Sequence, residues 1–280
     1  MNYYCLIAGL PDIEFEDHKL PFTIAGFREE VRPLLSGDDV RLIDLFYTKF
    51  DNLNLLRYLK NKEAKFDERG NLSKEALEED LNLIRDEENP KNRYFPPYFK
   101  VFVAEYYDVQ QSQQQVETDD AKWENRLAEL YYQWAMKCGN QMIRNWFEFN
   151  LNLNNLLAAY TGREYEIEVE IVGDNEVAEA IKTSRQRDFG LTGTFDDLDI
   201  FQRLAEETDM FEREKKIDLL KWQWLDEQTF FKFFSIEWLF AYLVKLESIE
   251  RWTSLNPEQG EKLFRELINS LKNSVVNYKS

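Results

Sequence analysis

A stretch with the pattern of a helix occurs twice in this chain. Residues 46–58 read FYTKFDNLNLLRY and residues 147–160 read FEFNLNLNNLLAAY, so that Asn54 falls on Asn155 when the copies are shifted by about 101 residues. Similarity within one chain at a fixed offset indicates a repeated structural unit. We therefore expect helical packing units that are copies of one another.

The fold class follows from the content of glycine and proline and from the spacing of apolar residues. Only 10 Gly and 7 Pro occur among 280 residues, which favours long helices over many short strands. Apolar residues recur every three or four positions from Trp123 to Tyr160. This spacing predicts one helix of about 40 residues that starts near residue 119, with Gly139 as a bend and Gly162 as its end.

The same spacing and the usual helix start signals predict the other helices. Four of them begin at Ser36 or Asp38, at Ser73, at Pro96-Pro97, and at Leu198 after Thr194 and Asp197. Three more cover residues 211–225, 229–252 and 261–276.

One segment has the period of a strand instead. Its apolar members alternate with glutamates, which predicts a strand with one wet face. Near the N-terminus a second alternating segment is its candidate partner, because a lone strand is unstable. The alternating apolar residues are Tyr165, Ile167, Val169 and Ile171 in the first segment and Tyr3, Cys5 and Ile7 in the second.

Together these patterns predict an all-α fold with at most a minor short β pairing. We expect a single helical domain over residues 1–280, with internal repeats at about 36–118, 119–193 and 194–280. The Gln-rich run 110–115 is the best candidate for a linker within it.

Charge and hydropathy restrict the partners of this chain. Its net charge of −18 repels nucleic acid and anionic lipid headgroups. We recognise no signal peptide, and no apolar run reaches the ~20 residues of a membrane span, so we expect no direct membrane insertion. Two distant cysteines, Cys5 and Cys138, suit a reducing cytoplasm.

Residues with obvious chemistry are scarce. His18 is the one histidine, neither cysteine lies in a nucleophile motif, and no glycine-rich phosphate loop is present. The abundant carboxylates fit solvated helix faces, and the alternative is a metal-dependent enzyme that uses carboxylates alone. We therefore predict no catalytic residue, no metal ligand and no cofactor.

The asparagines of the repeated stretch call for an explanation, because asparagine is a poor helix former. Two interpretations are open. Their amides either cap backbone groups or fix a turn at the helix end, or they orient one lobe against the next. The second copy contains Asn150, Asn152, Asn154 and Asn155, and the first contains Asp51, Asn52 and Asn54.

These helix ends resemble a known family. FDNLNLLRYLKNK and FNLNLNNLLAAYTGREY are similar to the signature of the C (or d) subunit of archaeal and vacuolar rotary ATPases, with the best match over Asp51, Asn52, Leu53, Leu56 and Arg57. The segment 240–268, with Glu247 ahead of a break, looks like the family's closing part. The chain also resembles a divergent bacterial version of that subunit, of the Bacteroides type.

The sequence departs from the family at two places. The opening Ala-Arg-x-Arg is replaced by Ala8-Gly9-Leu10-Pro11, and Ala158 stands where the first copy has Arg57. The contacts that these arginines would make are therefore not expected here.

The resemblance implies a helical protein of three similar lobes that catalyses nothing. It implies a place in the central stalk, between the membrane rotor ring of proteolipid subunits and the central-shaft subunits, in the cytoplasm and peripheral to the inner membrane. The residues expected to organise the lobes are Asp51, Asn52, Asn54, Arg57, Asn152, Asn154, Asn155 and Glu247. The alternative is a helical adaptor that binds another protein outside any rotary ATPase.

Overall fold

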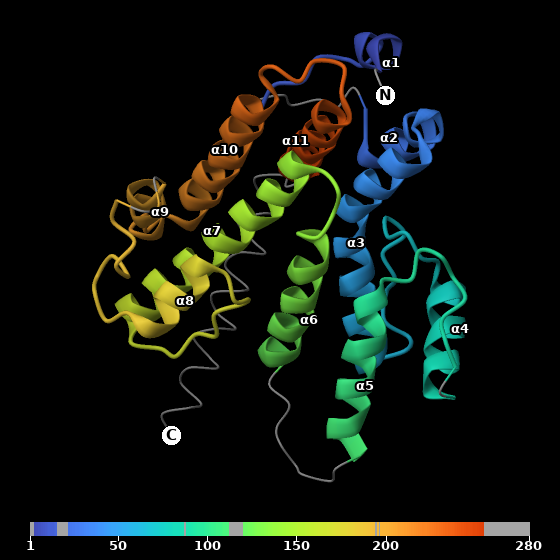
Figure 1. The fold of residues 1–280 in the computed structure, drawn as a ribbon, viewed down its shortest axis with the longest axis horizontal. Helices are drawn as coiled ribbons and strands as arrows, with labels where there is room; N and C mark the ends of the chain where they lie inside the picture. Colours follow the sequence, from blue (N-terminus) through green and yellow to red (C-terminus); the bar gives the residue numbers. More distant parts are fainter. Residues whose placement is uncertain are drawn as a thin grey trace. The chain divides into compact units, whose positions relative to one another are not determined.

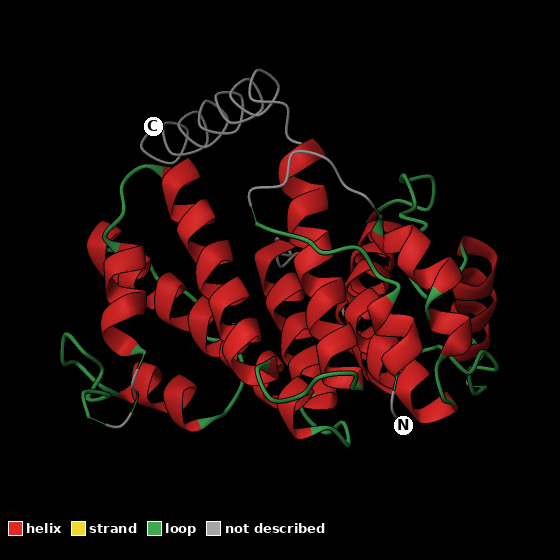
Figure 2. Cartoon of the chain, turned by 90° about the horizontal axis from the view of Figure 1, so that it is seen from above, coloured by secondary structure: helices red, strands yellow, loops and turns green. Residues whose placement is uncertain are grey.

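The computed structural model describes residues 3–15, 22–86, 88–111, 120–193, 195 and 197–254. In these ranges every regular element is a helix, and no strand occurs (Figures 1 and 2), which confirms the all-α prediction for the described part of the chain. In chain order the elements are α1 Tyr4–Ala8, α2 Ile24–Glu30, the 3-10 turn η1 Arg32–Leu34, α3 Gly37–Lys60, α4 Lys74–Arg85, α5 Pro97–Gln111, α6 Asp120–Ala135, α7 Gln141–Tyr165, α8 Glu176–Thr183, α9 Leu198–Ala205, α10 Met210–Thr229 and α11 Ile236–Ser254.

The chain divides into two compact units. One comprises Met1–Leu35 and Asp218–Ser280, and the other comprises Ser36–Ile217. The first boundary coincides with the predicted start of the first repeat, and the second falls within α10 and within the predicted third repeat. The predicted single domain and its three repeats stay a prediction.

The unit Ser36–Ile217 has an aromatic core. Helices α3 and α7 both pack on α6, α4 and α6 pack on α5, and α8 and α9 pack on α7. The side chains of Tyr47, Phe99 and Phe102 are completely buried. Buried aromatic side chains remove a large apolar area from water and prefer a few fixed ring geometries, so they stabilise a rigid unit.

The other unit is built around α2 and α11, which contact each other. Phe27 from α2 and Phe240 from α11 are fully buried, and the ring of Phe27 stacks on Tyr242 at 6.3 Å between centroids. The backbone N–H of Ile24, at the start of α2, donates to Glu250 of α11 at 2.9 Å. A side chain of the neighbouring helix thus accepts from a helix-terminal N–H that has no acceptor within its own helix.

Four helices of the unit Ser36–Ile217 begin at a capping side chain. In each, the cap oxygen accepts a hydrogen bond from the backbone N–H three residues later, which satisfies a donor that the helix itself leaves unpaired. The caps are Ser36, Ser73, Asn140 and Asn175. The predicted helix starts at Ser36 and Ser73 are confirmed, and Pro97 begins α5 as expected.

The predicted helix of about 40 residues is wrong. The chain instead forms α6 and α7, separated by residues 136–140. Asn140 leaves the helical conformation and its side chain accepts a hydrogen bond from the N–H of Ile143 at 3.1 Å, which starts α7. Apolar residues keep their spacing across this break, so periodicity alone concealed it. Gly162 does not end the helix either, since α7 continues to Tyr165.

The predicted strand pair is also wrong. Tyr4–Ala8 forms α1, and the segment after Tyr165 has no regular structure. Glu166 ends α7 in the left-handed conformation with φ 54°. The apolar members of the alternating segment are only partly covered, since Tyr165 is 66% exposed and Ile167 56%.

The helix predicted over 229–252 begins later than expected. Thr229 closes α10, and α11 starts at Ile236. Between them Phe234 adopts a positive φ of 62°, which no helix permits. His18, Thr194, most of the Gln-rich run and the predicted helix 261–276 lie outside the described residues.

Candidate functional site

The first copy of the repeated stretch ties its helix to the loop that follows it. Asn54 on α3 donates from its amide nitrogen to the carbonyl oxygen of Asp67 at 2.8 Å and accepts from the N–H of the same residue at 2.8 Å. Both ends of one side chain therefore pair with one backbone residue. We call this pair of bonds the first clamp.

One turn earlier on the same face of α3, Asp51 holds the entry of the next helix. Its carboxylate accepts from the N–H of Leu72 at 3.0 Å and from the side chain of Asn71 at 3.1 Å. The cap residue Ser73 follows directly. Asp51 thus fixes the point from which α4 begins.

At Gly70 the loop approaches the side chains of α3 closely. A Cβ atom at Gly70 would stand 2.4 Å from Oδ1 of Asp51 and 3.3 Å from Nδ2 of Asn54. No other residue type fits between the loop and these two side chains without displacing them.

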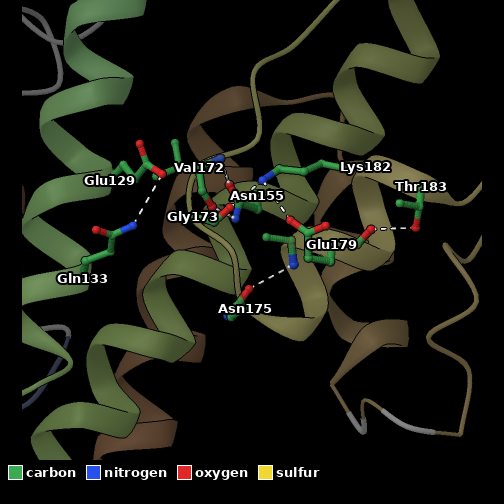
Figure 3. A network of polar contacts seen from close by, with 10 residues as sticks. Glu129, Gln133, Asn155, Val172, Gly173, Asn175, Glu179, Lys182 and Thr183 are labelled. Carbon is green, nitrogen blue, oxygen red and sulfur yellow. Dashed lines mark hydrogen bonds and ion pairs between the residues drawn. The ribbon is translucent and has the colours of Figure 1, made fainter.

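The second copy repeats the arrangement (Figure 3). Asn155 on α7 donates to the carbonyl oxygen of Val172 at 2.7 Å and accepts from its N–H at 3.0 Å. We call this pair the second clamp. It holds the last part of the loop between α7 and α8.

One turn before Asn155, Asn152 also reaches the next helix. Its side-chain oxygen accepts from the amide of Asn175 at 2.7 Å, and Asn175 caps α8 by accepting from Ala178 at 3.0 Å. Lys182 of α8 returns to the loop, where its ammonium donates to the carbonyl of Gly173 at 2.6 Å (Figure 3).

The two copies therefore resemble each other in sequence and in the hydrogen bonds that their side chains form with the following loop. The clamp residues are Asn54 and Asn155, and the residues that hold the next helix are Asp51 and Asn152. All four side chains are buried, with exposed fractions between 1% and 5%. A buried amide that lost its partners would carry a desolvation cost of about 1–3 kcal/mol.

Asn52 and Arg57, also on α3, form other hydrogen bonds. Asn52 accepts a hydrogen bond from the hydroxyl of Tyr98 on α5 at 2.5 Å, and Arg57 donates to the carbonyl of Lys65 at 3.4 Å, in the loop of the first clamp. Burial raises the pKa of Tyr98 well above its usual value, and the neighbouring Tyr131 and Asp51 act in the same direction.

Asn154 and Glu247 take no part in the clamps. Asn154 is exposed and donates to the hydroxyl of Tyr132 at 3.3 Å. Glu247 lies on α11, which belongs to the other unit. The structure thus groups Asp51 and Asn54, and Asn152 and Asn155, at two equivalent junctions. Arg57 also contacts the loop of the first clamp, whereas Asn52, Asn154 and Glu247 take no part in the clamps.

These contacts bear on the two interpretations of the asparagines. The amides of Asn54 and Asn155 bind backbone groups of the loops that follow their own helices, as the first interpretation expects, but both residues lie within α3 and α7 and not at the helix ends. Any role in orienting lobes stays a prediction.

The partners of the clamps could not be named beforehand. Asp67 and Val172 contribute backbone atoms, which carry no residue signature, and the loops differ in length, since the clamped residue lies 13 positions after Asn54 but 17 after Asn155. Asn175 carried a weak signal as a polar residue ahead of an apolar helix pattern.

The two junctions are built from hydrogen bonds between side chains and backbone. Both polar ends of each clamping amide are already bonded to backbone. In the described part of the chain no group of three or more His, Cys, Asp or Glu side chains is arranged to hold a metal ion. None of the described helices combines the length and apolar content that crossing a bilayer requires.

Comparison with known proteins gives one match. The family described as "Protein of unknown function (DUF2764)" matches residues 1–275. Neither the curated proteins nor the solved structures contain a match to the chain. Because the match extends over nearly the whole sequence, the chain belongs to the family "Protein of unknown function (DUF2764)".

Proposed function

We propose that this protein is a non-catalytic coupling subunit in the central stalk of a V- or A-type rotary ATPase. In this role it joins the membrane ring of proteolipid subunits to the central-shaft subunits during proton or sodium-ion transport linked to ATP synthesis or hydrolysis. It works in the cytoplasm, peripheral to the inner membrane through the complex.

One observation carries the proposal. The stretch that resembles the rotary subunit occurs twice, and in both copies its asparagine closes the same pair of bonds on the following loop, at Asp67 and at Val172. A duplicated junction of this kind suits a protein assembled from similar lobes.

Torque transfer requires that a helix and the segment after it move together. The two clamps supply that connection, because a loop held at both backbone atoms of one residue cannot pivot freely about the helix end. The aromatic core of the same unit adds stiffness, since closely packed interiors transmit strain. Neither feature needs a cofactor.

The direct test is the composition of the complex. A rotary ATPase extracted gently from the native cell and purified through its catalytic subunits should contain this protein together with ring and shaft subunits. A purified, active complex that lacks it would exclude the role.

A second test addresses the clamps. The double variant Asn54→Ala/Asn155→Ala should still assemble but should transport fewer ions for each ATP hydrolysed, whereas the neighbouring exposed Asn154→Ala should couple normally. If the double variant, Asn154→Ala and the parent protein all transported the same number of ions for each ATP, the clamps would have no part in torque transfer.

A helical adaptor is the second candidate, and the turn between α10 and α11 favours it. Three phenylalanines are exposed there, Phe230 at 63%, Phe231 at 87% and Phe233 at 63%. Neighbouring exposed aromatic side chains mark interaction sites. An adaptor would purify with a partner but without ring or shaft subunits, and Phe230→Ser/Phe231→Ser would release that partner.

A further inference from the structure

The loop between α7 and α8 borders an open groove of about 450 Å³. Its apolar walls come from α7, from the loop, from α8 and from the segment after α8, and Ile167 remains 56% exposed at its rim. The apolar side chains that line it are those of Ala159, Ile167, Val169, Ile171, Ile181 and Phe189. The unit therefore leaves an apolar surface uncovered beside this loop.

The backbone of the loop forms hydrogen bonds at Ile167 and at Val172, but not at the residues between them. At one end the N–H of Ile167 donates to the carbonyl of Gly162 at 2.9 Å, and at the other the second clamp holds Val172. From Ile167 to Val172 the chain makes no turn or bend. The backbone groups of residues 168–171 form no hydrogen bond with any described residue. Such a segment is open to pairing with a further strand.

The charges around the groove are unbalanced. Glu164, Glu166 and Glu168 are exposed, and none of them forms an ion pair with a described residue. The two cations that line the groove are already engaged. Arg163 donates to the carbonyl of Ser184 at 3.0 Å, and Lys182 donates to that of Gly173 and to Glu179. Donation to a carbonyl leaves the charge of a cation unchanged, but the three exposed glutamates outnumber these two cations, so the rim of the groove carries net negative charge.

These observations select one kind of occupant. We propose that residues 168–171 receive a basic, extended segment of a partner protein, which adds to this edge as a β-strand. Side chains of a strand alternate between its two faces, so a segment that alternates basic and apolar residues matches the loop. Its apolar side chains enter the groove and its basic side chains meet Glu166 and Glu168. Backbone pairing supplies affinity, and the alternation supplies specificity.

This surface goes beyond the proposed coupling role, because it names where a partner binds and which chemistry it offers. It requires no rotary complex, so the two proposals can fail separately.

The test uses the full-length protein and a labelled synthetic peptide of about eight residues with alternating lysine and valine. A second peptide contains the same residues in two blocks. Fluorescence anisotropy should show that the alternating peptide binds at least about tenfold more tightly, because only it can place all its charges on one face. Binding should also slow hydrogen exchange at the amides of residues 168–171.

Matched variants separate pairing from plain charge attraction. Glu166→Gln/Glu168→Gln should weaken binding about tenfold, since each exposed ion pair contributes up to about 1 kcal/mol. Glu148→Gln/Glu227→Gln removes the same charge from two exposed glutamates outside this edge and should leave binding unchanged. Glu168→Pro removes a backbone donor that is unpaired in the structure, so it should abolish pairing without lowering the unfolding midpoint.

Three outcomes would overturn the proposal. They are the absence of binding by the alternating peptide, equal binding of the block peptide, and an equal loss in the Glu148/Glu227 control.

Discussion

The side-chain amide of Asn155 pairs with Val172 as a neighbouring strand would, by donating to its carbonyl and accepting from its N–H at 2.7 and 3.0 Å. Asn54 pairs with Asp67 in the same way in the other copy of the repeat. No strand is needed in either loop, because one amide satisfies both backbone groups.

The clamps should contribute measurably to stability. Asn155→Ala and Asn54→Ala each remove two hydrogen bonds and leave a backbone N–H and C=O with no side-chain partner. We expect each variant to lose about 2 kcal/mol of the free energy of unfolding. Urea denaturation followed by circular dichroism measures this loss.

The exposed Asn154 is the control for both. Asn154→Ala should change the free energy of unfolding by less than about 0.5 kcal/mol. The double variant Asn54→Ala/Asn155→Ala should lose the sum of the single losses, because separate sites with no shared partner add. A loss at Asn154 as large as at Asn155 would show that the amide bonds are not the cause.

Gly70 should not tolerate a methyl group. Gly70→Ala places a Cβ atom 2.4 Å from the carboxylate of Asp51 and must displace the loop or that side chain. We expect a loss of about 2 kcal/mol, within the range for strain in a packed site. Thermal unfolding by calorimetry measures the change.

Gly37 provides the matched substitution. A Cβ atom there meets nothing within 4 Å, and Gly37 is the first residue of α3. Gly37→Ala should leave stability unchanged or raise it by about 0.5 kcal/mol, because alanine restricts the unfolded chain. If both alanine variants behaved alike, the close approach at Gly70 would be unimportant.

Tyr98 should make the protein sensitive to alkali. Burial raises its pKa in the folded state well above the usual value, so the folded protein keeps the phenol proton at a pH where the unfolded chain releases it. This contribution is complete below the unfolded pKa of about 10 and is lost as the pH rises through the folded pKa.

Tyr98→Phe tests that linkage. Near neutral pH the variant should lose about 1 kcal/mol, because the hydrogen bond to Asn52 disappears. Above about pH 10 its free energy of unfolding should fall less steeply than that of the parent protein. As a control near neutral pH, Tyr165→Phe alters a side chain that is 66% exposed and should change the free energy of unfolding by less than about 0.5 kcal/mol. Parallel profiles for Tyr98→Phe and the parent would contradict the prediction.

Asp218 should be the main polar contact between α10 and α11. It is 6% exposed and accepts from Ser248 at 3.1 Å, from Trp252 at 2.7 Å and from Arg251. Asp218→Ala removes all three of these contacts from a buried site and should cost about 3 kcal/mol.

Asp226 pairs with Lys245 between the same two helices, but its side chain is 59% exposed. Asp226→Ala should therefore cost less than about 1 kcal/mol by the same denaturation measurement. A similar cost for both variants would show that burial does not set the value of these contacts.

The all-α fold and most helix starts could be predicted from local features. Ser36 and Ser73 carry a capping oxygen, and the apolar period identifies the buried face of the helix that follows, so both signals act within a few residues. The equivalence of Asn54 and Asn155 was also visible, because the repeated letters align them. Both residues lie within their helices and bond the loop that follows.

The break between α6 and α7 escaped the same reasoning, because the apolar spacing continues across residues 136–140 while Asn140 competes for the backbone. The alternating segment at 165–171 failed for another reason. Period two describes which side chains share a face, but a strand also needs a partner backbone, and Asn155 supplies the bonds at Val172 in its place.

Local sequence was therefore sufficient to set the all-α class, most helix starts and the apolar faces, because capping and amphipathic spacing act between residues close in the chain. Packing alone decided what each helix end holds. Asp67, Gly70, Val172 and Asn175 acquire their roles through contacts with residues 13 to 23 positions away, and nothing in their own letters specifies which backbone atom a buried amide will meet.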